Sequence, residues 1–310
     1  MVVSIIISSF LLSILSAFYY QKILSKKGIF DKINLRSSHD SIATRSGGLS
    51  VFITLSIISL SFYFNGIELY DFSILIPLGI LFLVGIYDDV YNVDFTLKFI
   101  FQIIVAKIII DNGFVVDNLH GLFGVFEINR IIAQLLTMLI IVSIINAINL
   151  IDGIDGLASS ITLLFIFSYE SFASINTDFR FLSIIIITSL IPLYYFNFRK
   201  KNKIFLGDSG SYLLGGLISI YVLNILSPGY RIIPEFDINK IIFIISILIY
   251  PIIDVIRIFI VRMYRNKSPF HPDKNHIHHL VLAKTNNHFK TTLLLILCSL
   301  FFIIFIQLIF

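Results

Sequence analysis

The sequence predicts an all-α integral membrane protein with about ten transmembrane helices and a functional site on the cytoplasmic face. The 310 residues are 57% hydrophobic and only 14% charged, a composition far too apolar for a soluble domain. The apolar residues form runs of roughly 15 to 20 residues, about the length that an α-helix needs to cross a bilayer. Lys and Arg lie mainly in alternate connections between these runs, as expected for a polytopic membrane protein.

Ten apolar segments are expected to span the membrane, several of them close to the minimum length. They cover residues 2–20, 47–64, 73–87, 96–111, 130–148, 157–174, 180–197, 211–226, 239–264 and 291–309. No basic region precedes the first segment, so we expect a membrane helix there rather than a cleaved signal peptide. The single cysteine, Cys298, excludes an intrachain disulfide. We expect residues 1–310 to form a single transmembrane domain.

Positive charge distinguishes the two sides of the predicted bundle. The odd-numbered connections carry most of the Lys and Arg residues, in clusters within 22–45, 199–203 and 265–290. The even-numbered connections and their edges carry few: Arg130, Arg180, Arg231 and Lys240. The positive-inside rule therefore places the odd connections in the cytoplasm and both termini outside. The concentrated polar motifs all fall on these cytoplasmic connections, which favours chemistry on one side of the membrane over transport across it.

The segment Asn146–Ala158 carries the densest polar pattern at a membrane boundary. Polar groups recur at every third position, with only aliphatic residues and glycine between them: Asn146, Asn149, Asp152 and Asp155. Residues three apart are rotated by about 60° around the axis of an α-helix, and they lie almost in line in a 3₁₀ turn. Both geometries therefore place the four polar groups in a ladder. An ordinary capped turn would explain only one Asp and one Gly. Because carboxylates at the edge of lipid are costly and mark function, we expect this ladder to form part of the site.

Carboxylates also stand at two other predicted membrane boundaries. Asp88 and Asp89 are adjacent and repel each other unless a cation or a proton intervenes, although a solvated loop start is the simpler interpretation. Lys98 is either an interfacial lysine or a phosphate contact. Phe205–Ser211 places Asp208 among glycines and serines at a helix N-terminus. That arrangement suits phosphate oxygens, but an ordinary N-cap would use the same residues.

The segment His271–His279 holds four of the seven histidines: His271, His276, His278 and His279. A zinc site is one interpretation, but no cysteine is near, and the neighbouring carboxylates and amides are hard ligands better matched to Mg²⁺ or Mn²⁺. Arginines and lysines between Arg257 and Lys274 make the region cationic and suited to a pyrophosphate. A solvated loop beside the membrane is the alternative.

Together these motifs indicate an anionic, nucleotide-type substrate from the cytoplasm, a hard divalent metal and an amphiphilic second substrate from the bilayer. Phosphoryl transfer requires mainly charge neutralisation and alignment, which such a set of residues can supply. Nucleic acid is not expected as a partner.

In their order along the chain, the motifs resemble those of the polyprenyl-phosphate N-acetylhexosamine-1-phosphate transferases. These are bacterial glycosyltransferases of family 4, related to the enzymes that start O-antigen, common-antigen, teichoic-acid and lipid I synthesis. The resemblance rests on Asn34–His39, Arg45–Gly48, Asp88–Asp89, Asn146–Ala158, Gly207–Ser211 and His271–His279. It implies transfer of a sugar 1-phosphate from a UDP-N-acetyl sugar to undecaprenyl phosphate at the bacterial inner (cytoplasmic) membrane, with release of UMP. The product would start a lipid-linked cell-surface glycan, such as lipopolysaccharide O-antigen or a cell-wall polymer.

The resemblance also assigns roles to individual residues. It implies a Mg²⁺ site, with Mn²⁺ as an alternative, at Asn149 and Asp208. It implies catalytic or metal-adjacent carboxylates at Asp88, Asp89, Asp152 and Asp155. Contacts to the substrates, with Phe205 stacking on uracil and Lys98 near phosphate, are implied for Arg36, His39, Arg45, Lys98, Asn146, Phe205, His271, His276, His278 and His279.

The chain departs from the family pattern at Ile42 and Thr44, where relatives usually carry prolines. The sugar stays open among N-acetylglucosamine, N-acetylgalactosamine, N-acetylfucosamine and N-acetylquinovosamine, and homodimer formation is left open. We expect single displacement by the lipid phosphate, with a phosphoenzyme at Asp208 as the alternative. Two other classes are disfavoured. A transporter or flippase of polyprenyl-linked anionic lipids would place polar residues at mid-membrane in several spans, and a metalloprotease would carry His-Glu-x-x-His.

Overall fold

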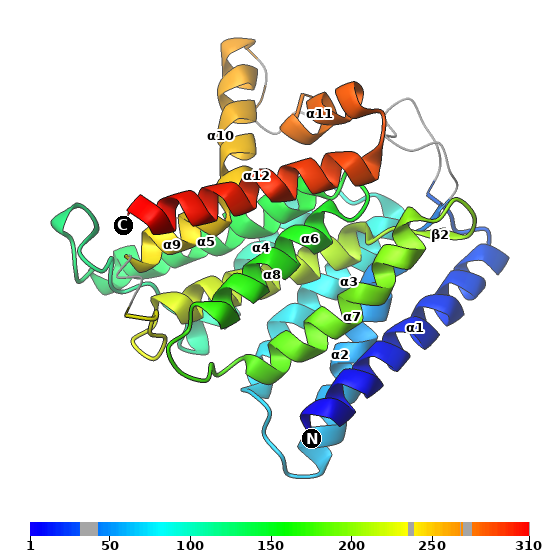
Figure 1. Cartoon of the computed structure of the whole chain (residues 1–310), viewed down its shortest axis with the longest axis horizontal. Coiled ribbons are helices and arrows are strands. Elements are labelled where there is room, and N and C mark those ends of the chain that lie inside the picture. The colour runs from blue at the N-terminus through cyan, green and yellow to red at the C-terminus, as the bar shows by residue number, and fades with distance from the viewer. Residues whose placement is uncertain (32–42, 235–238, 267, 269–274, 310) are drawn as a thin grey trace.

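The computed structural model describes residues 1–31, 43–234, 239–266, 268 and 275–309, which form a bundle of long helices (Figure 1). The α-helices are α1 (Val2–Lys26), α2 (Gly47–Phe64), α3 (Leu75–Tyr91), α4 (Phe95–Asp111), α5 (Arg130–Ile151), α6 (Leu157–Ser171), α7 (Arg180–Phe198), α8 (Gly207–Leu226), α9 (Lys240–Ile247), α10 (Ile249–Tyr264), α11 (Ile277–Thr285) and α12 (His288–Ile309). Short elements complete this part of the chain: the 3₁₀ turns η1 (Phe72–Ile74) and η2 (Leu122–Gly124) and the strands β1 (Ala43–Thr44) and β2 (Lys203–Ile204). The predicted all-α, multi-pass class is confirmed.

Each predicted membrane segment contains a helix, but not every described helix is long and apolar enough to span a bilayer. Seven meet this requirement: α1, α2, α3 together with η1, α5, α7, α8 and α12. The pair α9 and α10 makes an eighth when it is taken as one bent span. α6 is only 15 residues long, and α4 carries Lys98, Lys107 and Asp111 within 17 residues. By length and composition, seven or eight of the ten predicted spans in the described part of the chain therefore meet this requirement, and α4 and α6 pack against their neighbours α3, α5, α7 and α8.

The segment 239–264, predicted as one span, is broken at Leu248, where the axes of α9 and α10 differ by 75°. Pro251 supplies a physical reason, because it has no N–H for the carbonyl of Ile247 and its ring crowds the preceding turn. α9 stays within the bundle, whereas α10 projects away from it (Figure 1). The bend lets Asp254, which is fully buried on α10, meet the start of α11.

α8 forms the centre of the bundle. Every residue of the apolar stretch of α8 that could cross the membrane is buried inside the protein. α3 and α5 make its most extensive contacts, and α2, α6 and α9 also pack against it. The N-terminus of α8 is therefore held by the ends of α2, α3 and α5, and these ends carry the polar motifs.

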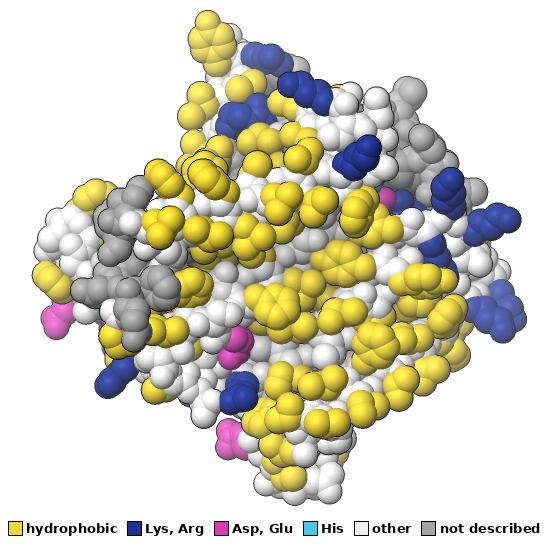
Figure 2. Space-filling model, viewed as in Figure 1, with side chains coloured by type: hydrophobic (Ala, Val, Ile, Leu, Met, Phe, Trp, Pro, Cys, Tyr) yellow, Lys and Arg dark blue, Asp and Glu magenta, His cyan; other side chains and the backbone are white. Residues whose placement is uncertain are grey.

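The surface in Figure 2 shows hydrophobic side chains spread over the long helices, as expected for contact with lipid. Lys and Arg side chains gather at the edge where α1 ends and β2 lies (Figures 1 and 2). The charge pattern predicts a cytoplasmic placement for these connections, and this placement stays a prediction.

Candidate active site

A short parallel pairing joins two motifs that are far apart in the sequence. Ala43 of β1 pairs with Lys203 of β2, and Thr44 pairs with Ile204. Immediately after the strands, the N–H of Gly47 donates to the carbonyl of Phe205 at 2.9 Å. The starts of α2 and α8 are so close that a Cβ atom on Gly48 would lie 2.3 Å from the backbone nitrogen of Gly210. The glycines of the two motifs thus allow the N-termini of two helices to touch.

Asp89, at the end of α3, caps the N-terminus of α8. Its two carboxylate oxygens accept hydrogen bonds from the backbone N–H groups of Asp208 at 2.9 Å and Ser209 at 3.0 Å. The guanidinium of Arg45 lies 3.4 Å from Asp89 and 3.8 Å from Asp208. A carboxylate at a helix N-terminus is stabilised by the free N–H groups and by the helix dipole. Asp89 therefore fixes the position of Asp208.

Asp88 faces a different set of partners. It is buried and forms an ion pair with Lys98, which reaches back from the start of α4. Its other oxygen accepts a hydrogen bond from the N–H of Val93 at 2.9 Å. The two adjacent aspartates that the sequence presents as a pair thus have separate roles in the structure, one towards α8 and one towards a lysine.

The polar ladder at the end of α5 contacts two different helices. The amide of Asn149 donates to Asp208 at 2.7 Å and to the hydroxyl of Ser211 at 2.9 Å, both on α8. Asn146, one turn earlier, exchanges two hydrogen bonds with the buried Gln102 of α4, at 2.7 and 3.3 Å. Asn149 therefore belongs to the acidic cluster, whereas Asn146 ties α5 to α4.

Asp152 and Asp208 make the centre of this cluster acidic. The side chain of Asp208 is 31% exposed. Burial, together with the carboxylates of Asp208, Asp89 and Asp155, raises the pKa of Asp152 well above its usual range. A nearby cation would stabilise the ionised form of such a carboxylate. Carboxylate and amide oxygens are hard ligands suited to Mg²⁺. The residues Asp208, Asn149 and Asp152 therefore fit a hard divalent metal.

Asp155, the last residue of the ladder, forms a buried ion pair. Its carboxylate lies 2.5 Å from the ammonium of Lys203 on β2. Its backbone N–H donates to the ring of His288 at 3.2 Å, and its carbonyl accepts from the hydroxyl of Thr292 at 2.8 Å. Asp155 thus links the loop after α5 to β2 and α12. The sequence pattern gave no sign of Lys203 or His288, because these partners are 48 and 133 residues away.

The histidine segment is organised by Asp254 of α10. One oxygen of this carboxylate accepts from the ring nitrogen Nδ1 of His276, and the other accepts from the N–H of Ile277, each at 2.7 Å. The guanidinium of Arg262 lies 3.3 Å from Nε2 of His276. Asp254 therefore caps α11 and, with Arg262, occupies both ring nitrogens of His276.

His278 is fully buried and turns towards the acidic loop. Its Nδ1 lies 3.1 Å from the hydroxyl of Tyr250, and its Nε2 has no hydrogen-bond partner among the described residues. A Cβ atom on Gly153 would lie 3.4 Å from Nε2 of His278 and 3.4 Å from Cε1 of His279. Burial and the neighbouring ring of His279 lower the pKa of His278 to about 3, so it is neutral. The histidines thus adjoin the loop that carries Asp152.

Three residues of the histidine segment and α10 lie close enough together to be tested as a metal site. Asp254, His276 and His278 offer ligand atoms within 4.8 Å of one another. The guanidinium of Arg257 lies 3.5 Å from Asp254, and that of Arg262 adjoins His276. Two positive groups beside these ligands oppose a zinc ion, and the direct hydrogen bond between His276 and Asp254 already satisfies both groups. We therefore assign this cluster as a hydrogen-bonded network.

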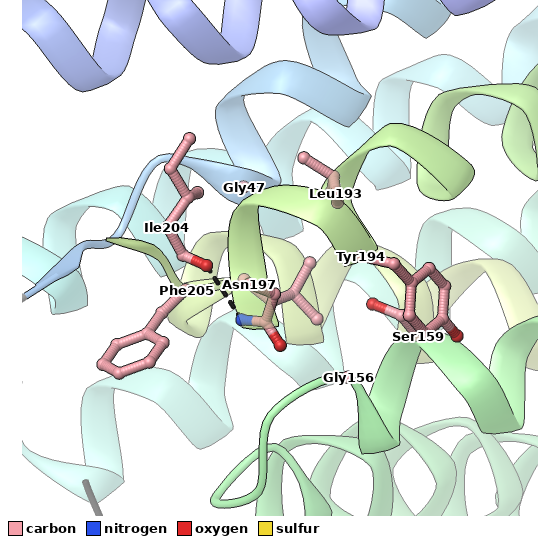
Figure 3. A pocket seen from close by; sticks show the side chains of 9 residues that line it. Gly47, Gly156, Ser159, Leu193, Tyr194, Asn197, Ile204 and Phe205 are labelled. Atoms are coloured by element: carbon pink, nitrogen blue, oxygen red, sulfur yellow. Dashed lines mark hydrogen bonds between the residues drawn. The ribbon is translucent and has the colours of Figure 1, made fainter. Parts of the chain in front are cut away.

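Phe205 lies beside a small cavity between β2, α6 and α7 (Figure 3). The ammonium of Lys203 is 5.0 Å from the centre of its ring. Asn197 donates to the carbonyl of Ile204 at 2.8 Å, while its amide oxygen lies buried without a partner among the described residues. The cavity has a volume of about 10 Å³, which is room for about one water molecule. Asn197 is a buried polar group that the sequence analysis did not identify.

The structure thus brings together most of the predicted site residues at one end of the bundle. Arg45 joins them through a 2.7 Å ion pair with Asp31, in addition to its contacts with Asp89 and Asp208. Three predicted residues lie outside the part of the chain that the structure describes: Arg36, His39 and His271. Of the two positions that differ from the family pattern, Thr44 lies in β1, and Ile42 lies outside the described residues.

Comparison with known proteins identifies a family and several relatives of this chain. A model of glycosyl transferase family 4 matches residues 71–226, about half of the chain. The undecaprenyl-phosphate alpha-N-acetylglucosaminyl 1-phosphate transferase of Pasteurella multocida is 34% identical over 302 residues, which cover 91% of this chain and 79% of that protein. A probable undecaprenyl-phosphate N-acetylglucosaminyl 1-phosphate transferase of Bacillus subtilis is 34% identical over 307 residues, covering 96% and 83%. The Escherichia coli K12 relative with the same name as the first is 28% identical over 292 residues, covering 89% and 75%.

The matched region includes Asp88, Lys98, the polar ladder and Asp208, so it contains the acidic cluster described above. The two relatives at 34% identity extend the similarity over nearly the whole chain. The chain therefore belongs to glycosyl transferase family 4, the family of the polyprenyl-phosphate N-acetylhexosamine-1-phosphate transferases that its motifs resemble.

Proposed function

We propose that this protein transfers N-acetylglucosamine 1-phosphate from UDP-N-acetylglucosamine to undecaprenyl phosphate, at the cytoplasmic face of the bacterial inner membrane. The names of its relatives support the acceptor and the sugar. The observation that carries the proposal is the convergence of three groups at one end of the bundle. These are the cluster around Asp208, the ion pair of Asp88 with Lys98, and the buried ring of His278 beside Gly153.

The acceptor phosphate is assigned to the Asp88–Lys98 pair. The ammonium of Lys98 would bind an oxygen of the lipid phosphate and favour its ionised form, and Asp88 would accept the remaining proton of that phosphate. Asp89 is not available for this task, because both of its oxygens hold the N-terminus of α8. Asp88 is therefore the base of the proposed reaction.

The donor is assigned to the acidic cluster and the residues around it. Asp208, Asn149 and Asp152 would hold Mg²⁺, which when bound would neutralise charge on the donor pyrophosphate. The neutral His278 can donate its Nε2 proton to a phosphate or sugar oxygen, since its Nδ1 can accept from Tyr250. Phe205 offers an aromatic face beside β2 for the uracil.

The proposed reaction is a single displacement. An oxygen of undecaprenyl phosphate attacks the phosphorus that carries the sugar, and the bond from this phosphorus to the bridging oxygen of the donor breaks. UMP leaves with that oxygen, and the product is the lipid diphosphate sugar. Asp208 accepts a hydrogen bond from Asn149 and lies near Arg45, so its contacts serve positioning rather than nucleophilic attack.

The proposal is tested by incubating the purified protein with undecaprenyl phosphate and a panel of UDP-sugars, with and without Mg²⁺, and measuring UMP release. UDP-N-acetylglucosamine is expected to support the fastest release, which should require both the lipid and the metal. Faster release from another UDP-sugar would correct the sugar alone, whereas the absence of UMP release with every donor would contradict the proposed reaction.

A further inference from the structure

A second polar site stands apart from the acidic cluster, in an open groove between the end of α1 and the segment that joins α7 to β2. The groove has a volume of about 770 Å³. Its apolar part is lined by Leu15, Phe18 and Tyr19, and its polar part by Lys22, Lys26 and Arg199. Figure 2 shows Lys and Arg side chains gathered at this edge of the molecule, beyond the hydrophobic surface of the helices.

The lining of the groove changes from apolar to basic along a single face of α1. Leu15, Tyr19, Lys22 and Lys26 follow one another at helical spacing, and the rise of an α-helix places about 16 Å between the first and the last. Leu15 and Tyr19 are both more than half exposed. The groove therefore presents an apolar wall towards the bilayer core and positive charge at the membrane boundary.

The positive groups of the groove have no counter-ion among the residues that the structure describes. Among the described residues, neither lysine nor Arg199 forms an ion pair with a carboxylate. The guanidinium of Arg199 is held in place by the ring of Phe196, 4.6 Å from its centre, and by hydrogen bonds to the carbonyl of Asn202. Three cations that line one groove attract an anion, and the fixed guanidinium limits the entropy lost on binding it.

We propose that this groove binds an anionic phospholipid of the cytoplasmic leaflet, with its phosphate between Lys22, Lys26 and Arg199 and an acyl chain along Leu15 and Tyr19. An amphiphile with a negative head matches both ends of the groove, whereas a soluble phosphate would leave the apolar wall uncovered. The acceptor lipid is assigned elsewhere, because its proposed partners Asp88 and Lys98 belong to α3 and α4. The inference is thus independent of the proposed transferase reaction.

The test uses the full-length protein in nanodiscs that contain either phosphatidylcholine alone or phosphatidylcholine with phosphatidylglycerol. Native mass spectrometry counts the lipids retained after release from the nanodisc. The wild-type protein is expected to retain phosphatidylglycerol in preference to phosphatidylcholine. The variant K22Q/K26Q/R199Q should lose this preference by about tenfold or more, since each basic residue near the membrane surface contributes to anionic-lipid binding.

Two further variants sharpen the result. K27Q/K200Q/K201Q removes the same charge from the same edge but from residues that do not line the groove, so it should keep the preference. K22Q/K26Q keeps the contact of Arg199 with the ring of Phe196, and it tests the groove if the triple variant does not fold. Equal losses in the groove and control variants, or equal retention of both lipids by the wild type, would overturn the site. Displacement of phosphatidylglycerol by equimolar undecaprenyl phosphate would overturn the assignment to a phospholipid.

Discussion

Asp88 and Asp89 are neighbours in the sequence, yet the structure gives them different tasks. Asp88 is paired with Lys98, and Asp89 caps α8. We predict that Asp88→Asn lowers kcat by about 10² to 10⁴, the range expected for loss of a general base. Asp89→Asn keeps one acceptor for the helix and should instead lower stability by about 1 kcal/mol. Steady-state UMP release and thermal unfolding in detergent measure the two effects.

The control for this pair is the second variant itself, which removes the same charge one residue away. Equal losses of kcat in folded Asp88→Asn and Asp89→Asn proteins would contradict the division of labour between the two carboxylates.

The histidines divide in a similar way. Both ring nitrogens of His276 are occupied by Asp254 and Arg262, whereas Nε2 of His278 faces Gly153 without a partner among the described residues. His278→Ala should therefore lower kcat/KM by about 10- to 100-fold, the worth of a hydrogen bond to a charged group. His276→Ala leaves a buried carboxylate under-satisfied and should destabilise the protein by about 1–3 kcal/mol. Normal activity of His278→Ala, measured at saturating Mg²⁺, would remove His278 from the site.

The lowered pKa of His278 also predicts how stability depends on pH. Its pKa is about 3 in the folded protein, compared with 6.5 in an unfolded chain. The unfolded state therefore binds the additional proton first as the pH falls. The contribution of the neutral ring is fully present above pH 6.5 and is lost progressively as the pH falls towards 3. Between pH 6.5 and pH 5 the loss should be about 2 kcal/mol.

Thermal unfolding at these two pH values checks this prediction, with His278→Gln as the control, because glutamine does not titrate. The shift between pH 6.5 and pH 5 should be smaller in the variant, and an identical shift in both proteins would assign the pH dependence to other groups.

At the level of the helices, sequence patterns located the segments but not the break between α9 and α10. An apolar run with one proline is compatible with a continuous kinked membrane helix, and the packing of Asp254 against α11 adds to the effect of Pro251 in favouring a sharp turn here. The ladder shows the same limit. Its regular spacing predicted four polar groups in register. In the structure Asn146 contacts Gln102 and Asp155 contacts Lys203, and no local sequence pattern predicts these two contacts.

The break makes a prediction at the same scale. Pro251→Ala restores the missing N–H and allows the helix to straighten across Leu248. A straighter α10 would withdraw Asp254 from the N–H of Ile277, which is 2.7 Å away in the native protein. We expect faster hydrogen exchange at the start of α11 and a fall in kcat, with no loss of exchange protection in α8. Unchanged exchange at Ile277 would show that Pro251 does not set the bend.

For the whole molecule, the positive charge pattern predicted that the polar motifs would meet at one end of the bundle. That convergence is seen for the described residues of the motifs, which come from the ends of α2, α3, α5 and α8 and from the start of α11. The sequence could not give the partners of each carboxylate, because those depend on how helices 40 to more than 100 residues apart pack together. Family membership supports the proposed reaction, and the residues of the acidic cluster lie within the region that the family model matches.

The central claim is that Asp208 anchors a metal-binding cluster on which sugar-phosphate transfer depends. Its most direct test is the Mg²⁺ dependence of UMP release from UDP-N-acetylglucosamine, compared between the wild type and Asp208→Ala, with folding checked by thermal unfolding. We predict Mg²⁺-dependent release by the wild type and a loss of about 10³-fold or more in the folded variant. Near-normal release by Asp208→Ala would contradict the account.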